Sequence, residues 1–473
     1  MVFSSIVFLL YFLPAFLITY HFADKKYKNI VILVFSIFFY SWGAPKFIFV
    51  ILGTTFIDFH LVRWMSQTRE DLHRKLMLAL SVSINLGLLV YFKYSNFFIE
   101  NVNAALSVFG DHHIQWTKLV LPIGISFYTF ETITYVVDVY RRVHKPLDNF
   151  WDYQTYIILF PKLIAGPIIR YHDLADQITD RTQNDTTDDK LMGFYRFCIG
   201  LAKKVMIANH MGLQADTIFA MDYSGLGTYT AWIGILAYTF QIYFDFSGYS
   251  DMAIGIGRMI GFKFPENFNN PYVSRSITEF WRRWHITLGA WMKNYLYIPL
   301  GGNKVSTRRL YFNLWIVFLA SGLWHGASWS FIIWGAYHGL FLVLERAFLL
   351  KIYDRIGKLP STLITFFIVM IGWVFFRIER VGDAAGYLKR LFSFDFHQDI
   401  SIDSEFYTYL LIAIFFAFFT YFKRGRKIQD AIYFDPYSNK RHMGVFGLSV
   451  ALLLLCISSI TAFGFNPFIY FRF

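Results

Sequence analysis

Long uncharged runs separated by short polar stretches organise this sequence. They occupy residues 1–23, 29–45, 79–92, 119–130, 223–244, 310–344, 359–376, 406–422 and 443–469. A helix needs about 20 apolar residues to cross the hydrocarbon core of a bilayer, and several of these runs are that long. The shorter runs are typical of tilted, broken or re-entrant segments buried in protein. We therefore predict an all-α polytopic membrane protein with roughly ten to twelve membrane helices.

The composition agrees with this class of protein. Only 16% of the residues are charged, against about 25% in soluble proteins, and no polar stretch is long enough for a separate soluble domain. We therefore treat residues 1–473 as a single integral-membrane domain. The two cysteines, Cys198 and Cys456, lie in apolar surroundings. They are interpreted as small core residues, because they form neither a disulfide framework nor a metal-binding spacing.

Basic residues between the runs predict the orientation of the chain. The first run has no basic region before it, so we interpret it as a retained span rather than a signal peptide. Lys25, Lys26 and Lys28 follow it and mark the cytoplasmic side, and Lys440 and Arg441 mark the same side before the last run. Both termini are then expected outside the cytoplasm. Topology and anionic membrane lipid explain the net charge of +12, so nucleic acid is not an expected partner.

His325 lies near the middle of the longest uncharged run. An ionisable group in such surroundings is costly to keep, which makes it a functional candidate. The alternative is a structural histidine bonded to a neighbouring backbone carbonyl. The run is too long for one span, and we expect it to break at Ser321-Gly322 and at Gly326. His338 follows 13 residues later and would point in a different direction on a continuous helix, so we interpret it as structural.

A second histidine, His285, lies in the segment SITEFWRRWHITLGAW, residues 276–291. Ser276 and Glu279 have the spacing of a capping box and predict a helix start, and Glu279 and Arg283 can pair one turn apart. Trp281 and its neighbour Trp284 are of the type found at membrane interfaces. The segment is therefore interpreted as an interfacial helix. From these residues alone, a functional histidine and a mere membrane anchor are equally expected.

Acidic residues also occur in apolar context. They are Glu131, Asp138, Asp245 and Asp251. Such groups mark transport paths, substrate contacts or buried pairs. We expect Asp138 to pair with the nearby arginines, and a bend at residues 247–250 between Asp245 and Asp251. A structural role for these two acids is at least as well supported as a catalytic one. The glycines at 255, 257 and 261 are interpreted as helix-packing positions rather than a nucleotide-binding motif.

Five segments in their order along the chain resemble the membrane-bound O-acyltransferase family. They are FPKLIAGPIIR (160–170), YFDFSGYSDMAIG (243–255), NFNNPY (267–272), ITEFWRRWHITL (277–288) and SGLWHGASWSFIIWGAYHG (321–339). The branch resembled contains the membrane subunit of bacterial alginate O-acetylation, and the membrane proteins of peptidoglycan O-acetylation and teichoic-acid D-alanylation are similar. The resemblance implies a ring of helices with re-entrant segments around a central tunnel. It also implies two functional histidines, His325 and His285. Six further residues are expected to line the tunnel: Trp324, Asp245, Tyr249, Asp251, Asn267 and Trp281.

The resemblance implies acyl transfer without a bound cofactor. The donor would be cytoplasmic acetyl-CoA. The acceptor would be a polysaccharide hydroxyl outside the cell, reached directly or through an extracytoplasmic partner transferase of the SGNH type, and the location would be the bacterial inner membrane. Our hypothesis is that His325 acts as general base, because a neutral imidazole suits that task. His285 would orient the donor or stabilise the oxyanion. A covalent acyl-histidine intermediate remains an alternative.

Other functions are also compatible with the residues. D-alanyl or another acyl group could be transferred to a cell-wall polymer. A transporter that acylates nothing would also have intramembrane acids and broken helices, but we find no inverted repeat in the sequence. The sequence does not choose between alginate-like exopolysaccharide and peptidoglycan as acceptor.

Overall fold

The computed structural model describes residues 1–110, 113–397, 399–464 and 468–469, and within these ranges the chain forms helices joined by loops, with no strand. Six helical segments within the described residues are long and apolar enough to cross a membrane. They are α3 (Ile48–Gln67), α4 (Asp71–Leu106), α15 with its continuation (Trp329–Ile356), α17 (Lys358–Arg377), α19 with its continuation (Ser404–Tyr421) and α21 (Asn439–Phe463). The predicted all-α polytopic membrane protein is thereby confirmed.

The remaining α-helices are shorter, more polar or both, and α16 among them is the last part of the α15 segment. They are α1 (Leu13–Phe22), α2 (Lys28–Gly43), α5 (Ile125–Tyr140), α6 (Phe150–Ile158), α7 (Phe160–Leu163), α8 (Tyr171–Thr179), α9 (Thr187–Ala202), α10 (Asn209–Phe219), α11 (Thr228–Met259), α12 (Ile277–Arg283), α13 (Ile286–Trp291), α14 (Thr307–His325), α16 (Leu350–Ile356), α18 (Val381–Leu391) and α20 (Lys423–Tyr433). The expected number of ten to twelve membrane helices would include some of these, and it stays a prediction.

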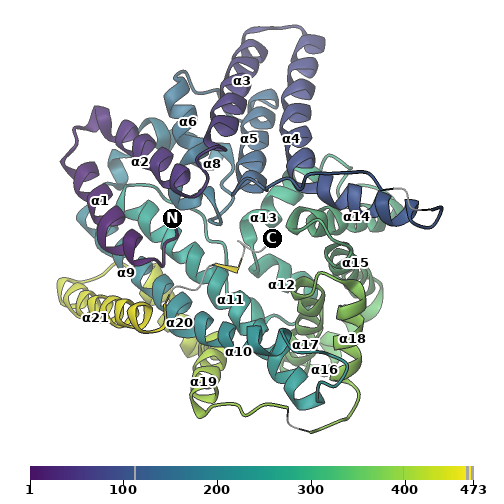
Figure 1. Cartoon of the computed structure of the whole chain (residues 1–473). Helices are drawn as coiled ribbons and strands as arrows, with labels where there is room; N and C mark the ends of the chain where they lie inside the picture. Colours follow the sequence, from purple (N-terminus) through teal and green to yellow (C-terminus); the bar gives the residue numbers. More distant parts are fainter. Residues whose placement is uncertain (111–112, 398, 465–467, 470–473) are drawn as a thin grey trace.

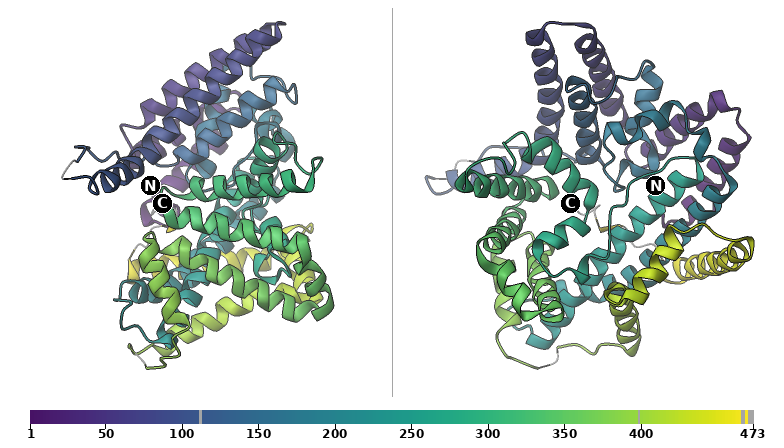
Figure 2. Two further views of the ribbon diagram at one scale, coloured as in Figure 1. Left: turned by 90° about the vertical axis from the view of Figure 1, so that its right-hand side faces the viewer. Right: turned by 180° about the vertical axis from the view of Figure 1, so that it is seen from behind.

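Several of the six apolar membrane helices lie around a central region that contains the long helix α11 and the short helices α12 and α13. In Figure 1, α4, α15, α19 and α21 lie toward the outside, whereas α11, α12 and α13 lie near the middle. The side view in Figure 2 shows that the helices are steeply inclined to one another. Nearly every residue of α11 is buried, which identifies this helix as the core of the molecule.

Helices α9 and α11 approach each other through glycines. A Cβ atom built on Gly200 would lie 2.6 Å from the carbonyl oxygen of Gly248, and one on Gly193 would lie 2.6 Å from that of Gly255. Small residues allow such close backbone contact between membrane helices. The predicted packing role of Gly255 is confirmed. The predicted bend at residues 247–250 is wrong, because α11 is continuous there and its small residues serve helix packing instead.

Substituting Gly200 by alanine is expected to destabilise the fold by about 1–3 kcal/mol, because the new methyl group overlaps the α11 backbone. The purified variant should therefore unfold in detergent at a clearly lower temperature than the wild type. Gly87→Ala is the matched control, since a Cβ atom on that α4 residue meets nothing within 4 Å. Equal melting temperatures for the two variants would contradict the packing role of Gly200.

Candidate active site

His325 ends α14 at a sharp break between two membrane segments. The helix stops at His325, Gly326 is extended, and Ser328 caps the start of α15 at Trp329 by accepting a hydrogen bond from the Phe331 N–H. The predicted break at Gly326 is therefore confirmed. The predicted break at Ser321-Gly322 is wrong, because α14 runs through this pair.

Gly322 instead lets α14 pack closely on α15. A Cβ atom there would overlap the carbonyl oxygen of Phe331, and one on Gly335 would overlap that of Phe318. The two helices thus form a hairpin with backbone contact on its inner side. The hairpin fixes the position of His325 at its turn.

The His325 side chain is buried among aromatic rings. Its exposed fraction is 4%, and its ring centroid lies 4.9 Å from Trp324, 5.1 Å from Trp334 and 5.2 Å from Phe376. These surroundings exclude bulk water from the imidazole.

A lysine that the sequence reasoning missed holds the end of α14. Lys93, in the interior of α4, donates hydrogen bonds to the carbonyl oxygens of Trp324 and His325 and to Ser126 Oγ on α5. The neighbouring Tyr94 donates to the Leu323 carbonyl at 2.6 Å. A cation at the C-terminus of a helix satisfies its free carbonyls and complements its dipole. The position of Lys93 directly after the apolar run 79–92 was the signal in the sequence that could have identified it.

His285 lies at a second break, between α12 and α13. Ser276 caps α12 by accepting from the Glu279 N–H at 3.0 Å, and Arg283 pairs with Glu279 at 2.8 Å, as predicted. The helix then stops at Arg283, and His285 adopts left-handed backbone angles with φ of 45°. A residue with a side chain rarely takes that conformation, and such strain is concentrated at functional sites.

The tryptophans of this segment pack against other aromatic side chains, with Trp284 buried and Trp281 partly buried. Trp284 is 2% exposed and its ring lies 4.9 Å from that of Trp373. Trp281 packs against Trp334 at 5.5 Å and His338 at 5.0 Å. Trp284 is therefore packed inside the protein and is not a lipid-facing anchor, whereas the position of α12 at the membrane interface stays a prediction. The pattern of tryptophans and arginines did not reveal that α15 and α17 cover this segment.

Asn267 holds the His285 ring by a hydrogen bond. His285 Nδ1 and Asn267 Oδ1 are 3.0 Å apart. The same Oδ1 accepts from the N–H of Thr287 at 3.3 Å and from its hydroxyl at 2.9 Å, and Asn267 Nδ2 donates to Ser250 Oγ at 3.0 Å. A backbone N–H only donates, so these partners assign the amide oxygen to the side that faces His285.

This arrangement determines which nitrogen of His285 carries the proton. Because Asn267 Oδ1 is an acceptor, His285 Nδ1 must be the donor, and a neutral ring then keeps its lone pair on Nε2. Among the described residues Nε2 has no hydrogen-bond partner, although the side chain is only 1% exposed. Nε2 is thus placed to accept a hydrogen bond from a ligand or a water molecule.

The rings of both histidines lie next to that of Trp324. The ring centroid of Trp324 lies 6.1 Å from that of His285 and 4.9 Å from that of His325. Trp324 also donates from Nε1 to the Ser126 carbonyl at 3.4 Å. The structure thus brings His285, His325, Trp324 and Asn267 together from distant parts of the chain. Trp281 lies one ring away, because Trp334 contacts both Trp281 and His325.

The other three predicted tunnel residues, Asp245, Tyr249 and Asp251, lie on α11 and contact residues other than the two histidines. Asp245 pairs with Lys204 at 2.6 Å. Asp251 bonds Arg196 at 2.7 Å and Lys203 at 2.6 Å. Tyr249 stacks on Phe3 with centroids 4.5 Å apart. These contacts are structural in character, and the tunnel itself stays a prediction.

The two acidic residues on α5, Asp138 and Glu131, have partners that are distant in the sequence. Asp138 accepts from Tyr295 at 2.7 Å and bonds His172 at 2.8 Å. The expected pairing with the adjacent arginines is wrong, and Arg141 instead donates to the Asn294 carbonyl. Glu131 forms a fully buried ion pair with Lys162.

Comparison with known proteins identifies the family. The model of the MBOAT, or membrane-bound O-acyltransferase, family matches residues 3–376. A probable alginate O-acetylase AlgI of Pseudomonas aeruginosa is 46% identical over 395 residues, which cover 83% of this chain and 75% of that protein. The corresponding protein of Pseudomonas putida is 41% identical over the full length of both chains. A peptidoglycan O-acetyltransferase of Helicobacter pylori is 37% identical, covering 82% of this chain and 79% of its own. The chain therefore belongs to the membrane-bound O-acyltransferase family and is an O-acyltransferase.

Proposed function

We propose that this protein transfers an acetyl group from cytoplasmic acetyl-CoA across the inner membrane to a hydroxyl of an extracytoplasmic polysaccharide. The relatives named as alginate or peptidoglycan O-acetylating enzymes are 37–46% identical, whereas a teichoic acid D-alanyltransferase of Bacillus subtilis is 28% identical. This difference supports acetyl over D-alanyl as the transferred group, and an alginate-like exopolysaccharide is the first acceptor to test.

The observation that carries the proposal is the pair of buried imidazoles at two chain breaks. Histidine is the side chain best suited to move a proton near neutral pH, and irregular backbone at membrane depth occurs where it is buried or lines a cavity. His325 is proposed as general base. It takes the proton from the acceptor hydroxyl while that oxygen bonds to the thioester carbonyl carbon. The carbon–sulfur bond then breaks, CoA leaves as thiolate, and the proton can pass to the sulfur.

The assigned tautomer of His285 narrows its proposed role. A neutral ring with hydrogen on Nδ1 presents only a lone pair at Nε2, so it accepts a hydrogen bond but cannot donate one to an oxyanion. The arm of acetyl-CoA next to the thioester contains amide N–H groups. We therefore assign His285 to orienting the donor, by accepting one of these N–H groups at Nε2, and not to stabilising the oxyanion.

The proposed direction of transfer needs one cytoplasmic and one external side. Lys25, Lys26 and Lys28 support a cytoplasmic position for the turn between α1 and α2, with both termini outside. An SGNH-type transferase outside the membrane, implied by the family resemblance, would receive the acetyl group on a serine and pass it to the polymer.

The test compares cells that lack the protein with cells that carry the wild type or the His325→Ala variant. Ester-linked acetyl groups on exported polysaccharide and on peptidoglycan are measured by mass spectrometry. We expect one of these polymers to lose its acetyl groups without the protein, and the variant to restore none. Loss of D-alanine esters with unchanged acetylation would overturn the proposal.

A further inference from the structure

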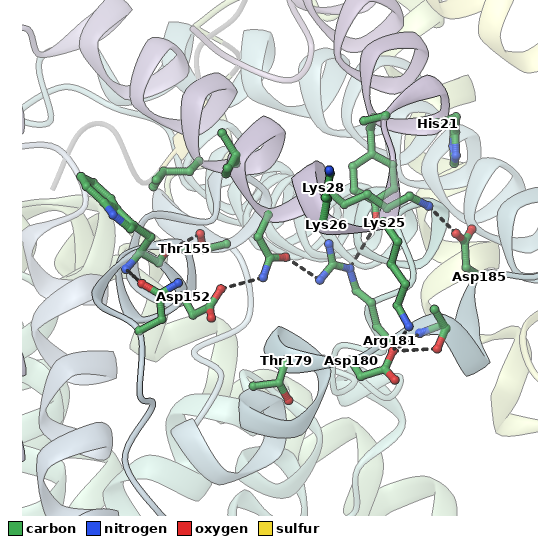
Figure 3. A pocket seen from close by; sticks show the side chains of 18 residues that line it. His21, Lys25, Lys26, Lys28, Asp152, Thr155, Thr179, Asp180, Arg181 and Asp185 are labelled. Atoms are coloured by element: carbon green, nitrogen blue, oxygen red, sulfur yellow. Dashed lines mark hydrogen bonds and ion pairs between the residues drawn. The ribbon is translucent and has the colours of Figure 1, made fainter.

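A large pocket lined by several charged side chains lies away from the two histidines. It has a volume of about 760 Å³ and is formed by the turn between α1 and α2, by α6 and by residues 179–185. Figure 3 shows Arg181 near the middle of the pocket. Lysines of the α1–α2 turn lie above it, and Asp152 and Thr155 lie to its left. The same lysines predict the cytoplasmic side of the membrane.

Two cationic side chains of this pocket, Lys26 and Arg181, lack a carboxylate partner among the described residues. Its lining contains four cationic residues, Lys25, Lys26, Lys28 and Arg181, and three acids, Asp152, Asp180 and Asp185, which leaves a net charge of +1 (4 − 3). Lys28 pairs with Asp185 at 2.5 Å, and Lys25 pairs with Asp180 at 3.4 Å. In the described part of the chain, Lys26 and Arg181 have no carboxylate within ion-pair distance.

The first of these pairs is a stable one. Burial raises the pKa of Asp185, but the hydrogen bonds from Lys190 and Lys28 outweigh this effect and hold the pKa at about 2. Asp185 therefore stays ionised at any physiological pH, and its negative charge is shared between Lys28 and Lys190, which pairs with it at 2.8 Å.

Arg181 is buried, and its partners among the described residues are neutral. It is 9% exposed. Its Nε donates to Tyr20 Oη and to the Ile260 carbonyl, each at 3.1 Å, and its Nη1 donates to Asn29 Oδ1 at 2.7 Å. Its Nη2 has no hydrogen-bond partner within the described ranges. A buried cation requires a counter-charge, and the flat guanidinium can bind a phosphate through two parallel hydrogen bonds.

The nearest remaining acid does not supply that counter-charge. Asp152 accepts a hydrogen bond from Asn29 Nδ2 at 2.8 Å, so the Asn29 amide lies between the carboxylate and Arg181. The amide relays part of the field but leaves the guanidinium without a direct anionic partner.

The rim of the pocket is apolar on the outer side of the molecule. Ile30 and Trp151 line the pocket and are 51% and 57% exposed. Next to them along α1 and α2, Phe22 is 88% and Val34 is 57% exposed. A soluble anion would gain nothing from this surface. The acyl chains of a lipid would cover it, and a tryptophan at the rim is typical of the level of lipid headgroups.

We propose that this pocket binds the phosphate of an anionic phospholipid of the cytoplasmic leaflet, with Arg181 and Lys26 as its ligands. Basic pockets between membrane helices on that side are suited to such headgroups. The acyl chains lie along the outer faces of α1 and α2. The site is independent of the transferred acyl group and of the two histidines.

The experiment measures lipid retained by the purified full-length protein, using native mass spectrometry with phosphatidylglycerol or phosphatidylcholine added in detergent. The wild type is expected to retain phosphatidylglycerol preferentially. Lys26→Gln should weaken that preference about fivefold, the effect of one lysine near an anionic surface, and Arg181→Gln should weaken it further. Lys26 is exposed, so its substitution leaves the fold intact even if Arg181→Gln does not fold.

Lys351→Gln is the matched control, because Lys351 is an exposed lysine on α16, outside the pocket. It should retain phosphatidylglycerol like the wild type. Equal retention of both lipids by the wild type would overturn the proposal, and so would identical behaviour of Lys26→Gln and Lys351→Gln. Displacement of the lipid by millimolar inorganic phosphate would assign the pocket to a soluble anion and would also overturn the lipid as its occupant.

Discussion

Replacing His325 by alanine is expected to lower the turnover of acetyl transfer by about 10²- to 10⁴-fold, the usual contribution of a positioned general base. The loss should appear in kcat, with KM for acetyl-CoA nearly unchanged, because the base acts on the acceptor hydroxyl and not on the donor. The measurement is release of CoA by purified protein reconstituted with its acceptor, over a range of acetyl-CoA concentrations.

His338→Asn is the control for this variant. His338 is a buried histidine on α15 that contacts Trp281 and Trp334, and it has no assigned part in the transfer. Its substitution is expected to change kcat by no more than about threefold, since a structural histidine contributes to folding and not to the proton transfer. Should His338→Asn lose as much turnover as His325→Ala while both variants stay folded, His325 would not be the base.

Replacing Asn267 by leucine is expected to raise KM for acetyl-CoA by about 10- to 100-fold, which corresponds to about 1–3 kcal/mol for leaving buried polar partners unsatisfied. Without Asn267 Oδ1, none of the observed contacts of His285 selects the tautomer that is protonated on Nδ1. Nε2 is then no longer always available to accept a hydrogen bond from acetyl-CoA. His285→Ala should show the same change in KM. The ¹⁵N chemical shifts of the His285 imidazole report the tautomer directly.

The Asn267→Asp variant tests whether the lost hydrogen bond, and not the changed side-chain volume, causes the increase in KM. Aspartate keeps an acceptor oxygen toward His285 Nδ1, so KM should return close to the wild-type value. Its negative charge favours a protonated imidazole, so the acidic limb of the pH–rate profile should move to higher pH. If His285→Ala lowers kcat strongly and leaves KM unchanged, the base would be His285 and the orienting role would be wrong.

The apolar pattern was sufficient for the class of fold but not for the course of individual helices. Run lengths predicted the membrane helices and the break at Gly326. They could not distinguish a glycine that breaks a helix from one that brings two helices together, and both Gly322 and Gly248 are of the second kind. That distinction depends on which helix lies opposite, and local sequence does not contain this information.

The histidines were predictable from sequence, but their surroundings were not. His325 followed from its apolar run, whereas His285 needed the family resemblance. Asn267 was an expected tunnel residue. Its function in fixing a tautomer depends on Ser250 and Thr287, which are 17 and 20 positions away. Lys93 was missed because its acceptors lie at the far end of another helix.

The contact between Lys93 and the end of α14 also has a consequence for how the protein is made. Lys93 and Trp324 are 231 residues apart, so at about 5–20 residues per second the ribosome needs roughly 10–50 s between them. During this interval α4 is already in the bilayer with a lysine whose placement there costs about 2.5–3.5 kcal/mol. The carbonyl groups that will accept its hydrogen bonds do not yet exist. Until α14 has been synthesised and inserted, the insertion machinery or trapped water must solvate the Lys93 ammonium group. The N-terminal half therefore reaches its final structure only after the second half has been made.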